Sequence, residues 1–301
     1  MKKYYYGINK MNHYFEGWYF KQVFNGQTIV FIPGISYANE TKEAFIQVIV
    51  NDISTFISFS IDEFYAKKDE LFIQIGGNIF TKRGIKICIH KCGINIDGVI
   101  RFGKLNPLKY SIMGPLQWLP LLECSHNIIS MDHSVYGHLT IDGKAIVISR
   151  GRGYIESDHG RSFPKNYIWS QCNQFTEPFT SIMVAVADVL IHKVMFQGTI
   201  AVILYKGIEY RFATYLNVKV KVCTKNKIVL TQNGMILKVH LCKNNHVKLM
   251  APKNGSMART IHENVNSKVH YYFEVNHRVL LDEICDVASY ESVMDVNHFL
   301  P

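Results

Sequence analysis

The segment VHYYFEV, residues 269–275, decides the class of fold. Its odd-numbered residues are Val, Tyr, Phe and Val, and its even-numbered residues are His, Tyr and Glu. Successive side chains of a β-strand point to opposite faces, so a period of two is typical of a strand with one face on a core. The segment therefore predicts a half-buried strand.

The same alternation recurs along the chain and is separated by turn signals. It is present in TFISFSI (55–61), IKICIH (85–90) and LNVKVKV (216–222). The dipeptides Asn25-Gly26, Asp97-Gly98, Asp142-Gly143, Asn233-Gly234 and Asn254-Gly255 accept the positive φ angles of tight hairpin turns. We therefore expect an all-β fold of antiparallel strands in barrels or sandwiches. Helices should be few, and residues 280–299 are the best candidate for one.

Length and charge restrict the class of protein. The chain has 301 residues, of which 48% are hydrophobic, so it can bury a sizeable core in one large or two ordinary domains. We place the boundary near Pro164 and Lys165, which gives domains at 1–165 and 166–301. The net charge of +9 comes from 33 basic and 24 acidic residues. The basic residues are scattered, which argues against nucleic-acid binding but permits peripheral contact with an anionic membrane.

The cysteines and the N-terminus indicate a cytoplasmic protein. Seven cysteines at irregular spacing fit reduced thiols better than a disulfide framework. Cys88 and Cys92 are four residues apart, but no second pair follows, so we expect no zinc site. The N-terminus lacks an apolar signal region, and the chain contains no run of about 18 apolar residues. We expect neither a metal nor a cofactor.

Three segments place polar groups and large aromatic rings on one face of a strand. An apolar pocket with a few directed polar groups needs this mixture, and a closed barrel points every second residue inward. We expect the three faces to line one cavity, although a packed indole beside a satisfied buried acid would look the same on a single strand. The faces are Glu16, Trp18 and Phe20 in FEGWYFK, Tyr154, Glu156 and Asp158 in YIESD, and Trp169, Gln171, Asn173 and Phe175 in WSQCNQF.

A fourth segment, residues 113–137, contains Glu123, His126 and His133. Its spacing does not resemble HExxH, so hydrogen-bonded or core histidines are favoured over metal ligands. Ser162 lies in GRSFP, which is not the G-x-S-x-G turn of a serine nucleophile. Neither metal catalysis nor nucleophilic catalysis is indicated.

Four motifs together resemble the tocopherol cyclase family. They are FEGWYFK (15–21), GPLQWLPLLECSH (114–126), GYIESDHGRSFPKNYIWSQCNQF (153–175) and MAPKNGSMARTIHENV (250–265), the last being similar to a signature of bacterial members. The resemblance implies two lipocalin-like β-barrels in tandem. It also implies closure of a chromanol ring on a prenylated hydroquinone without a redox cofactor.

The resemblance also supplies candidate site residues. Asp158 and His159 depart from the family pattern, because plant-type members resemble EKNWG where this chain has ESDHG. Asp158 is therefore a weaker candidate for a shared proton donor than Glu156. The best matches are Glu16, Trp18, Glu156, Lys165, Trp169, Gln171 and Asn173, and His126 matches in type.

Two main functions fit these residues. In a cyclase, a carboxylic acid kept protonated by an apolar pocket starts ring closure; Glu156 is the first candidate, followed by Glu16 and Asp158. Pairing of Glu156 or Asp158 with Lys165 or Arg161 would lower their pKa and weaken this hypothesis. In a non-catalytic lipocalin-like carrier, the same pocket binds an apolar or amphipathic molecule. Candidate substrate-binding residues are Trp18, His126, Lys165, Trp169, Gln171 and Asn173.

A third and weaker function is glycoside hydrolysis by Glu156 and Asp158. These enzymes hold their carboxylates about 5–9.5 Å apart across the sugar. Nothing else in the sequence supports it.

Overall fold

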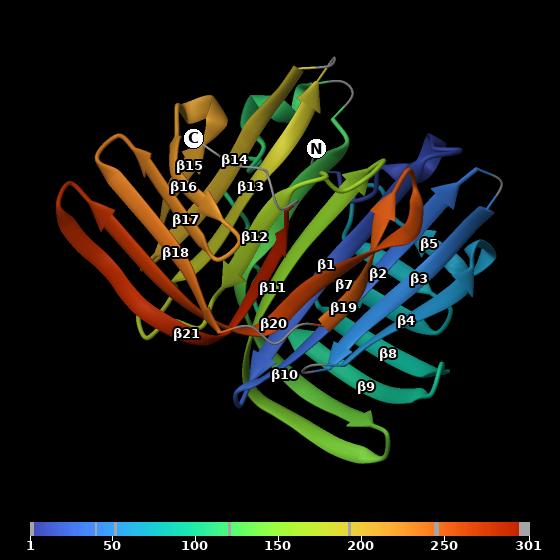
Figure 1. Ribbon diagram of the computed structural model, residues 1–301. Coiled ribbons are helices and arrows are strands. Elements are labelled where there is room, and N and C mark those ends of the chain that lie inside the picture. The colour runs from blue at the N-terminus through green and yellow to red at the C-terminus, as the bar shows by residue number, and fades with distance from the viewer. Residues whose placement is uncertain are drawn as a thin grey trace. The chain divides into compact units, whose positions relative to one another are not determined.

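The computed structural model describes residues 3–39, 41–50, 53–119, 122–191, 194–243 and 247–294. This part of the chain is nearly all strand, and its helices are four short 3-10 turns (Figure 1). None of these helices is long and apolar enough to cross a membrane. The all-β prediction is confirmed. The 3-10 helices are η1 (Gly7–Asn9), η2 (Ile61–Glu63), η3 (Gly114–Trp118) and η4 (Thr214–Leu216).

The first sheet has eleven antiparallel strands in the order β4-β3-β2-β1-β11-β10-β9-β8-β7-β6-β5. Strands β1 and β11 are neighbours although they are far apart in sequence. The bounds are β1 (Tyr14–Phe24), β2 (Gln27–Ala38), β3 (Thr41–Val50), β4 (Ile53–Ser60), β5 (Phe64–Ala66), β6 (Phe72–Ile75), β7 (Asn78–Thr81), β8 (Gly84–Lys91), β9 (Ile94–Phe102), β10 (Cys124–Ile141) and β11 (Lys144–Gly160).

The second sheet has ten strands, in the order β15-β14-β13-β12-β21-β20-β18-β17-β16, with β19 paired to β20. Both sheets are large, curled and antiparallel, as in lipocalin-like barrels. The bounds are β12 (Tyr167–Cys172), β13 (Ser181–Ile191), β14 (Val194–Tyr205), β15 (Ile208–Ala213), β16 (Lys219–Thr224), β17 (Lys227–Gln232), β18 (Met235–Lys243), β19 (Val247–Lys253), β20 (Ser256–Val275) and β21 (Arg278–Val293).

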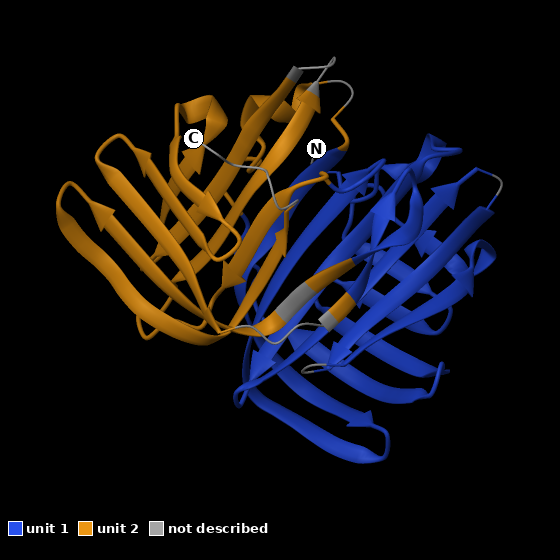
Figure 2. Cartoon of the chain, viewed as in Figure 1, with its two compact units in different colours: residues 1–107, 124–163, 249–260 blue, residues 108–123, 164–248, 261–301 orange. Residues whose placement is uncertain are grey.

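The chain forms two compact units, each of which includes a segment from the other half of the sequence (Figure 2). Unit 1 comprises residues 1–107, 124–163 and 249–260, and unit 2 comprises residues 108–123, 164–248 and 261–301. Within unit 1, the Gln47 amide exchanges two hydrogen bonds with the backbone of Met250, at 2.8 and 2.9 Å. Within unit 2, Arg211 donates to the carbonyls of Tyr110 and Ser111. That the chain divides near residue 165 into two domains stays a prediction.

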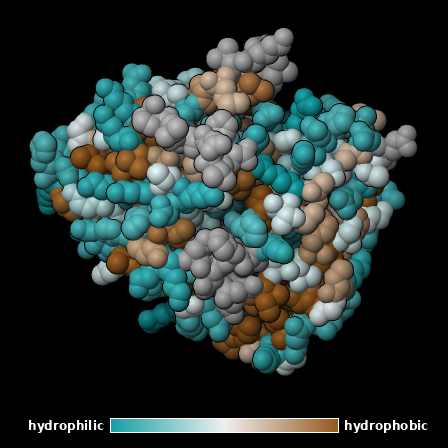
Figure 3. Space-filling model, viewed as in Figure 1, coloured by the Kyte–Doolittle hydropathy of each residue, from teal (hydrophilic) through white to brown (hydrophobic). Residues whose placement is uncertain are grey.

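Each unit has its own apolar core, built from the alternating faces. In β20, the predicted inward residues Val269, Tyr271 and Phe273 are fully buried. In β8, Ile87 and Ile89 enter the core of unit 1, and Cys88 between them is exposed. Burial of each such side chain stabilises the fold by about 1.5–3 kcal/mol. Hydrophilic and apolar residues are interleaved on the surface seen in Figure 3.

Two local expectations were wrong. Residues 278–293 form β21, because they pair with β20 and β12, and this pairing overrides the acidic residues near the start of the expected helix. The rest of that segment, from 295 on, lies outside the described residues. Asp97-Gly98 is not a turn but lies inside β9, where a Cβ on Gly98 would come within 2.2 Å of the His138 carbonyl oxygen. The turn between β8 and β9 is at Cys92-Gly93, with φ of 55° and 77°.

Candidate functional site

The pairing of β1 with β11 separates the predicted acids. Glu16 lies opposite His159, and Tyr19 lies opposite Glu156. Directly paired residues of antiparallel strands share a face, so Glu16 and Glu156 point to opposite faces of the sheet. The face of Glu16 carries the core residues Trp18 and Phe20. The structure therefore brings neither Glu16 nor Trp18 to Glu156.

On the other face, Glu156 belongs to a cluster with Tyr154, His126 and Asp158, in which the tyrosine and Glu156 are buried and the other two are half-buried. The Tyr154 hydroxyl donates to Glu156 Oε2 at 2.5 Å. His126 bridges the two acids, with Nε2 at 3.3 Å from Glu156 Oε2 and Nδ1 at 2.8 Å from Asp158 Oδ1. Tyr154 is 0% exposed and Glu156 is 5% exposed. Three alternate positions of β11 and one position of β10 thus assemble a tyrosine–acid–histidine–acid chain.

Burial and charge set the protonation of this cluster. Burial raises the pKa of Glu156, and His126 and the Tyr154 hydroxyl only partly counter it. Burial alone would lower the pKa of His126, but the carboxylates of Asp158 and Glu156 overcome it and raise that pKa well above its ordinary value. Burial also raises the pKa of Tyr154. Near neutral pH the His126 imidazole is therefore charged, and the Glu156 carboxyl binds a proton more tightly than an exposed glutamate does.

Glu16 forms a second buried site, on the core face. Its carboxylate accepts hydrogen bonds from the backbone N–H of Tyr6 at 2.9 and 3.1 Å and from the Tyr14 hydroxyl at 2.6 Å. Burial raises its pKa to about 7 against these hydrogen bonds. Trp18 Nε1 donates to the Tyr4 carbonyl at 3.1 Å. Glu16 and Trp18 therefore hold the N-terminal segment onto β1.

The two other notable histidines of unit 1 also lie on the core side. The His159 ring stacks on Tyr6 with centroids 4.0 Å apart, so it fills the place of an aromatic side chain, and burial lowers its pKa to about 4. His133 shares a 3.0 Å hydrogen bond with Ser130 and contacts the Phe102 ring, and burial lowers its pKa to about 3. Both imidazoles are neutral at pH 7, as expected of core histidines.

The remaining candidates lie in unit 2 or on the surface. Trp169 and Gln171 are buried in β12, on the face opposite the core residues Ile168 and Cys172. Asn173 follows β12 and is also buried. Lys165 and Glu123 are exposed.

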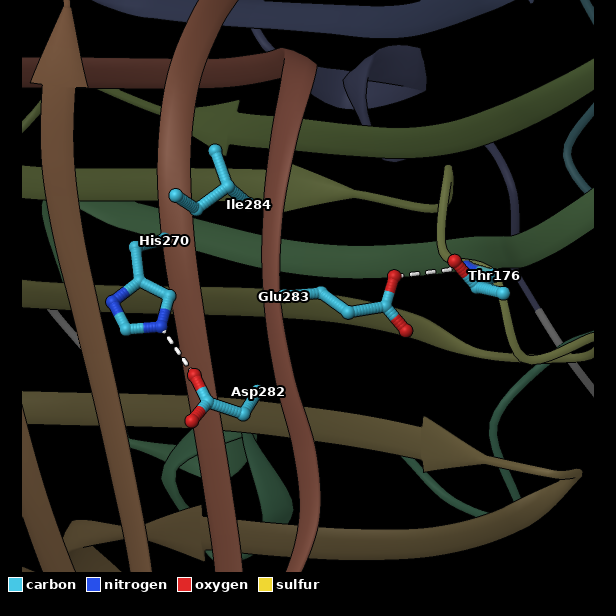
Figure 4. A pocket seen from close by; sticks show the side chains of 5 residues that line it. All are labelled: Thr176, His270, Asp282, Glu283 and Ile284. Atoms are coloured by element: carbon cyan, nitrogen blue, oxygen red, sulfur yellow. Dashed lines mark hydrogen bonds and ion pairs between the residues drawn. The ribbon is translucent and has the colours of Figure 1, made fainter.

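A surface hollow in unit 2 of about 550 Å³ is lined by none of the predicted residues (Figure 4). His270 shares a 2.5 Å hydrogen bond with Asp282, and Glu283 accepts from the backbone N–H of Thr176 at 2.9 Å. Ile284 completes the lining. The side chains of His270 and Asp282 are 37% and 56% exposed, so water competes with any ligand there.

Among the residues that the structure describes, two groups of side chains have the spacing of metal ligands. The ligand atoms of His126, Glu156 and Asp158 lie within 4.8 Å of one another, and those of Cys88, His90 and Asp97 do as well. Imidazole and carboxylate ligands suit several divalent ions, so the first group could hold one. In that group, Nδ1 of His126 already hydrogen bonds to Asp158, and Nε2 lies 3.3 Å from Glu156 Oε2.

Sequence reasoning missed Tyr154 as a partner of Glu156, although a signal was present. The pattern Tyr-x-Glu occurs three times on strands, and each time the tyrosine hydroxyl donates to the glutamate two residues later. The hydroxyl–carboxylate distances are 2.6 Å for Tyr14–Glu16, 2.5 Å for Tyr154–Glu156 and 2.5 Å for Tyr272–Glu274. Residues i and i+2 of a strand share a face, so the pairing follows from the spacing.

Comparison with known proteins gives a family and a fold. A family model described as tocopherol cyclase-like matches residues 77–297. No curated protein matches the chain. Among solved structures, CghA aligns with a TM-score of 0.60 at 8% identity over 95% of this chain and 90% of that chain.

Two further structures align over most of both chains. CghA with Sch210972 gives a TM-score of 0.56 at 10% identity, covering 93% of this chain and 88% of that chain. A putative AttH from Nitrosomonas europaea gives 0.53 at 10% identity, covering 95% and 94%. At such identities these likenesses establish the fold alone, and they agree with the lipocalin-like architecture.

Proposed function

The chain belongs to the tocopherol cyclase-like family, and we propose that it closes a ring in a prenylated phenol, or a similar apolar substrate, by proton transfer from Glu156. The observation that carries the proposal is the buried carboxyl of Glu156 in contact with Tyr154 and His126. A positioned acid whose pKa lies near the operating pH is effective in proton transfer. Burial moves the pKa of Glu156 in this direction, upward from its ordinary value.

The cluster supports a proton relay behind Glu156. Asp158 accepts from Nδ1 of His126, which fixes the imidazole and directs Nε2 toward Glu156 Oε2. In the Ser-His-Asp triad, the aspartate likewise holds the imidazole in position and stabilises its charged form. Asp158 is thus a positioning residue, and His126 returns a proton to Glu156 after each turnover.

The reaction conserves atoms and needs no oxidant. Glu156 gives its proton to one carbon of a trisubstituted alkene, and the other carbon becomes a tertiary cation. The phenol oxygen forms a C–O bond to that carbon and loses its own proton, which passes back through the relay to Glu156. Substrate and product are isomers. An apolar site favours both the protonated acid and the alkene.

The arrangement of the two acids argues against glycoside hydrolysis. The imidazole of His126 contacts both acids, with Nε2 facing Glu156 and Nδ1 facing Asp158. A glycosidase keeps the space between its two carboxyl groups open for the sugar and water. Here His126 occupies that space.

The test is single-turnover conversion of prenylated hydroquinones by the parent protein and by Glu156→Gln, followed by chromatography and mass spectrometry. Gln keeps the size and the hydrogen-bond acceptor but carries no transferable proton, so the rate of ring closure should fall by about 10²–10⁴-fold. Ligand binding, measured by fluorescence quenching, should stay within a few fold.

Glu274→Gln is the matched control. Glu274 also accepts from a tyrosine two residues earlier, but its histidine contact is with the fully exposed His277, whose Nδ1 lies 3.8 Å from Glu274 Oε1. The control should turn over as the parent does. Undiminished turnover by Glu156→Gln would remove Glu156 as the acid. Tight binding without turnover by the parent, across a panel of prenylated phenols, would instead establish the carrier function.

A further inference from the structure

The hairpin of β8 and β9 gathers three potential metal ligands on its outward face. Cys88 lies directly opposite Asp97, and His90 follows Cys88 on the same face of β8. His90 Nε2 is 3.1 Å from Asp97 Oδ2, and the three ligand atoms lie within 4.8 Å of one another. All three side chains are exposed, whereas Ile89 between them is buried.

The imidazole of His90 is held in the orientation that a metal ligand needs. Its Nδ1 shares a 3.2 Å hydrogen bond with the side-chain oxygen of Asn95, the residue paired with His90 across the hairpin. Asn95 is itself fixed, because its backbone N–H donates to Asp142 at 2.8 Å. When one imidazole nitrogen donates to an oxygen, the proton stays on that nitrogen and the other nitrogen is available to a metal. In His90 the available nitrogen is Nε2, which faces Asp97.

We propose that Cys88, His90 and Asp97 bind a zinc ion on this face of the hairpin. Zinc combines thiolate, imidazole and carboxylate ligands in a tetrahedron, with water in a fourth position that the protein leaves open. Bond lengths of about 2.0–2.3 Å require ligand atoms roughly 3.3–3.8 Å apart, which the present spacing reaches by small rotations of exposed side chains. The soft thiolate disfavours magnesium and calcium.

The proposed site does not use the Cys88–Cys92 spacing seen in the sequence. Cys92 occupies the turn between β8 and β9, with a φ of 55°, and is not part of the cluster. The partner of Cys88 is a residue across the hairpin, so the relevant spacing is set by strand pairing. Lys86, two residues before Cys88, is a neighbouring cation whose charge repels a bound metal ion.

The experiment is a titration of the metal-free protein with cobalt(II), followed by displacement with zinc. Thiolate bonded to cobalt gives a charge-transfer band in the near ultraviolet, and tetrahedral geometry gives visible bands. We expect one equivalent to produce both. Cys88→Ser should abolish the charge-transfer band, and His90→Gln should weaken cobalt binding by at least about 10-fold. Asn95→Ala should weaken it by about 10-fold through loss of the orienting hydrogen bond.

Two variants act as controls. Cys242→Ser removes another exposed thiol, and His126→Gln removes the other cluster with metal-ligand spacing. Both should bind cobalt with the parent's spectrum and affinity. Three results would overturn the proposal: the charge-transfer band persists in Cys88→Ser, it is lost in Cys242→Ser, or it is absent from the parent. These results are independent of ring closure by Glu156.

Discussion

Glu16 gives unit 1 a stability that depends on pH, and its size can be worked out from the structure. The side chain is 1% exposed, and burial raises its pKa from 4.5 to about 7. The folded state therefore binds the Glu16 proton more tightly than the unfolded state. The contribution is fully present below pH 4.5 and is lost as the pH rises through 7. Each pKa unit corresponds to about 1.4 kcal/mol, so the loss is about 3 kcal/mol.

The assay compares Glu16→Gln with the parent in urea unfolding at a series of pH values. Trp118 and Trp169 are replaced by Phe in both proteins, so that Trp18 alone reports on unit 1. Gln is neutral at every pH, and the contributions of other groups, including His159 with its lowered pKa, cancel in the difference. The stability of the variant relative to the parent should rise by about 3 kcal/mol between pH 4.5 and 8. A difference that does not change with pH would refute this reasoning.

Three further predictions concern the cluster and the hairpins. Asp158→Asn should lower the rate of ring closure by about 10-fold, a smaller loss than that of Glu156→Gln, and should shift the pH profile of the rate. The reason is that Asn can hold the imidazole in place but cannot stabilise its positive charge. An unchanged profile in a rate–pH series would exclude a positioning role. Gly98→Ala should lower the melting temperature markedly in a calorimetric scan, because its Cβ would meet the His138 carbonyl oxygen at 2.2 Å; a parental melting temperature would show that the strands can separate there. Folded His133 has a pKa of about 3, below its ordinary value of 6.5, so its contribution to stability is present above pH 6.5 and falls as the pH drops toward 3. His133→Gln should therefore lose less stability than the parent as the pH falls, measured by urea unfolding in acid. An equal loss in the two proteins would contradict the assignment.

The strands could be predicted because their signal is local. Alternation in segments such as VHYYFEV reports which side chains face the core, and Asn-Gly dipeptides report where the chain turns. Cys92-Gly93 forms a turn that the sequence reading missed, and Asp97-Gly98 forms none, because the small size of Gly98 serves a close approach between β9 and β10. A dipeptide alone does not distinguish a turn from a crowded strand.

The grouping of the site residues could be predicted only in part. Tyr154, Glu156 and Asp158 share a face by spacing alone. Whether His126 joins them depends on the pairing of β10 with β11, which contains register shifts between Ile128 and His133. These shifts leave His126 opposite Asp158 and His133 opposite Gly153, on different faces. No local pattern specifies such bulges, so which histidine meets the acids required the structure.

The chemistry of Glu156 is tested most directly by ring closure of a prenylated hydroquinone in D₂O. Proton transfer from Glu156 to the alkene predicts a cyclised product with one carbon-bound deuterium, seen as a single added mass unit that does not exchange in H₂O. Glu156→Gln should yield almost none of this product, and Glu274→Gln should yield as much as the parent. The account would be contradicted if the parent protein left the substrate unchanged, if the cyclised product carried no carbon-bound deuterium, or if Glu156→Gln formed as much labelled product as the parent.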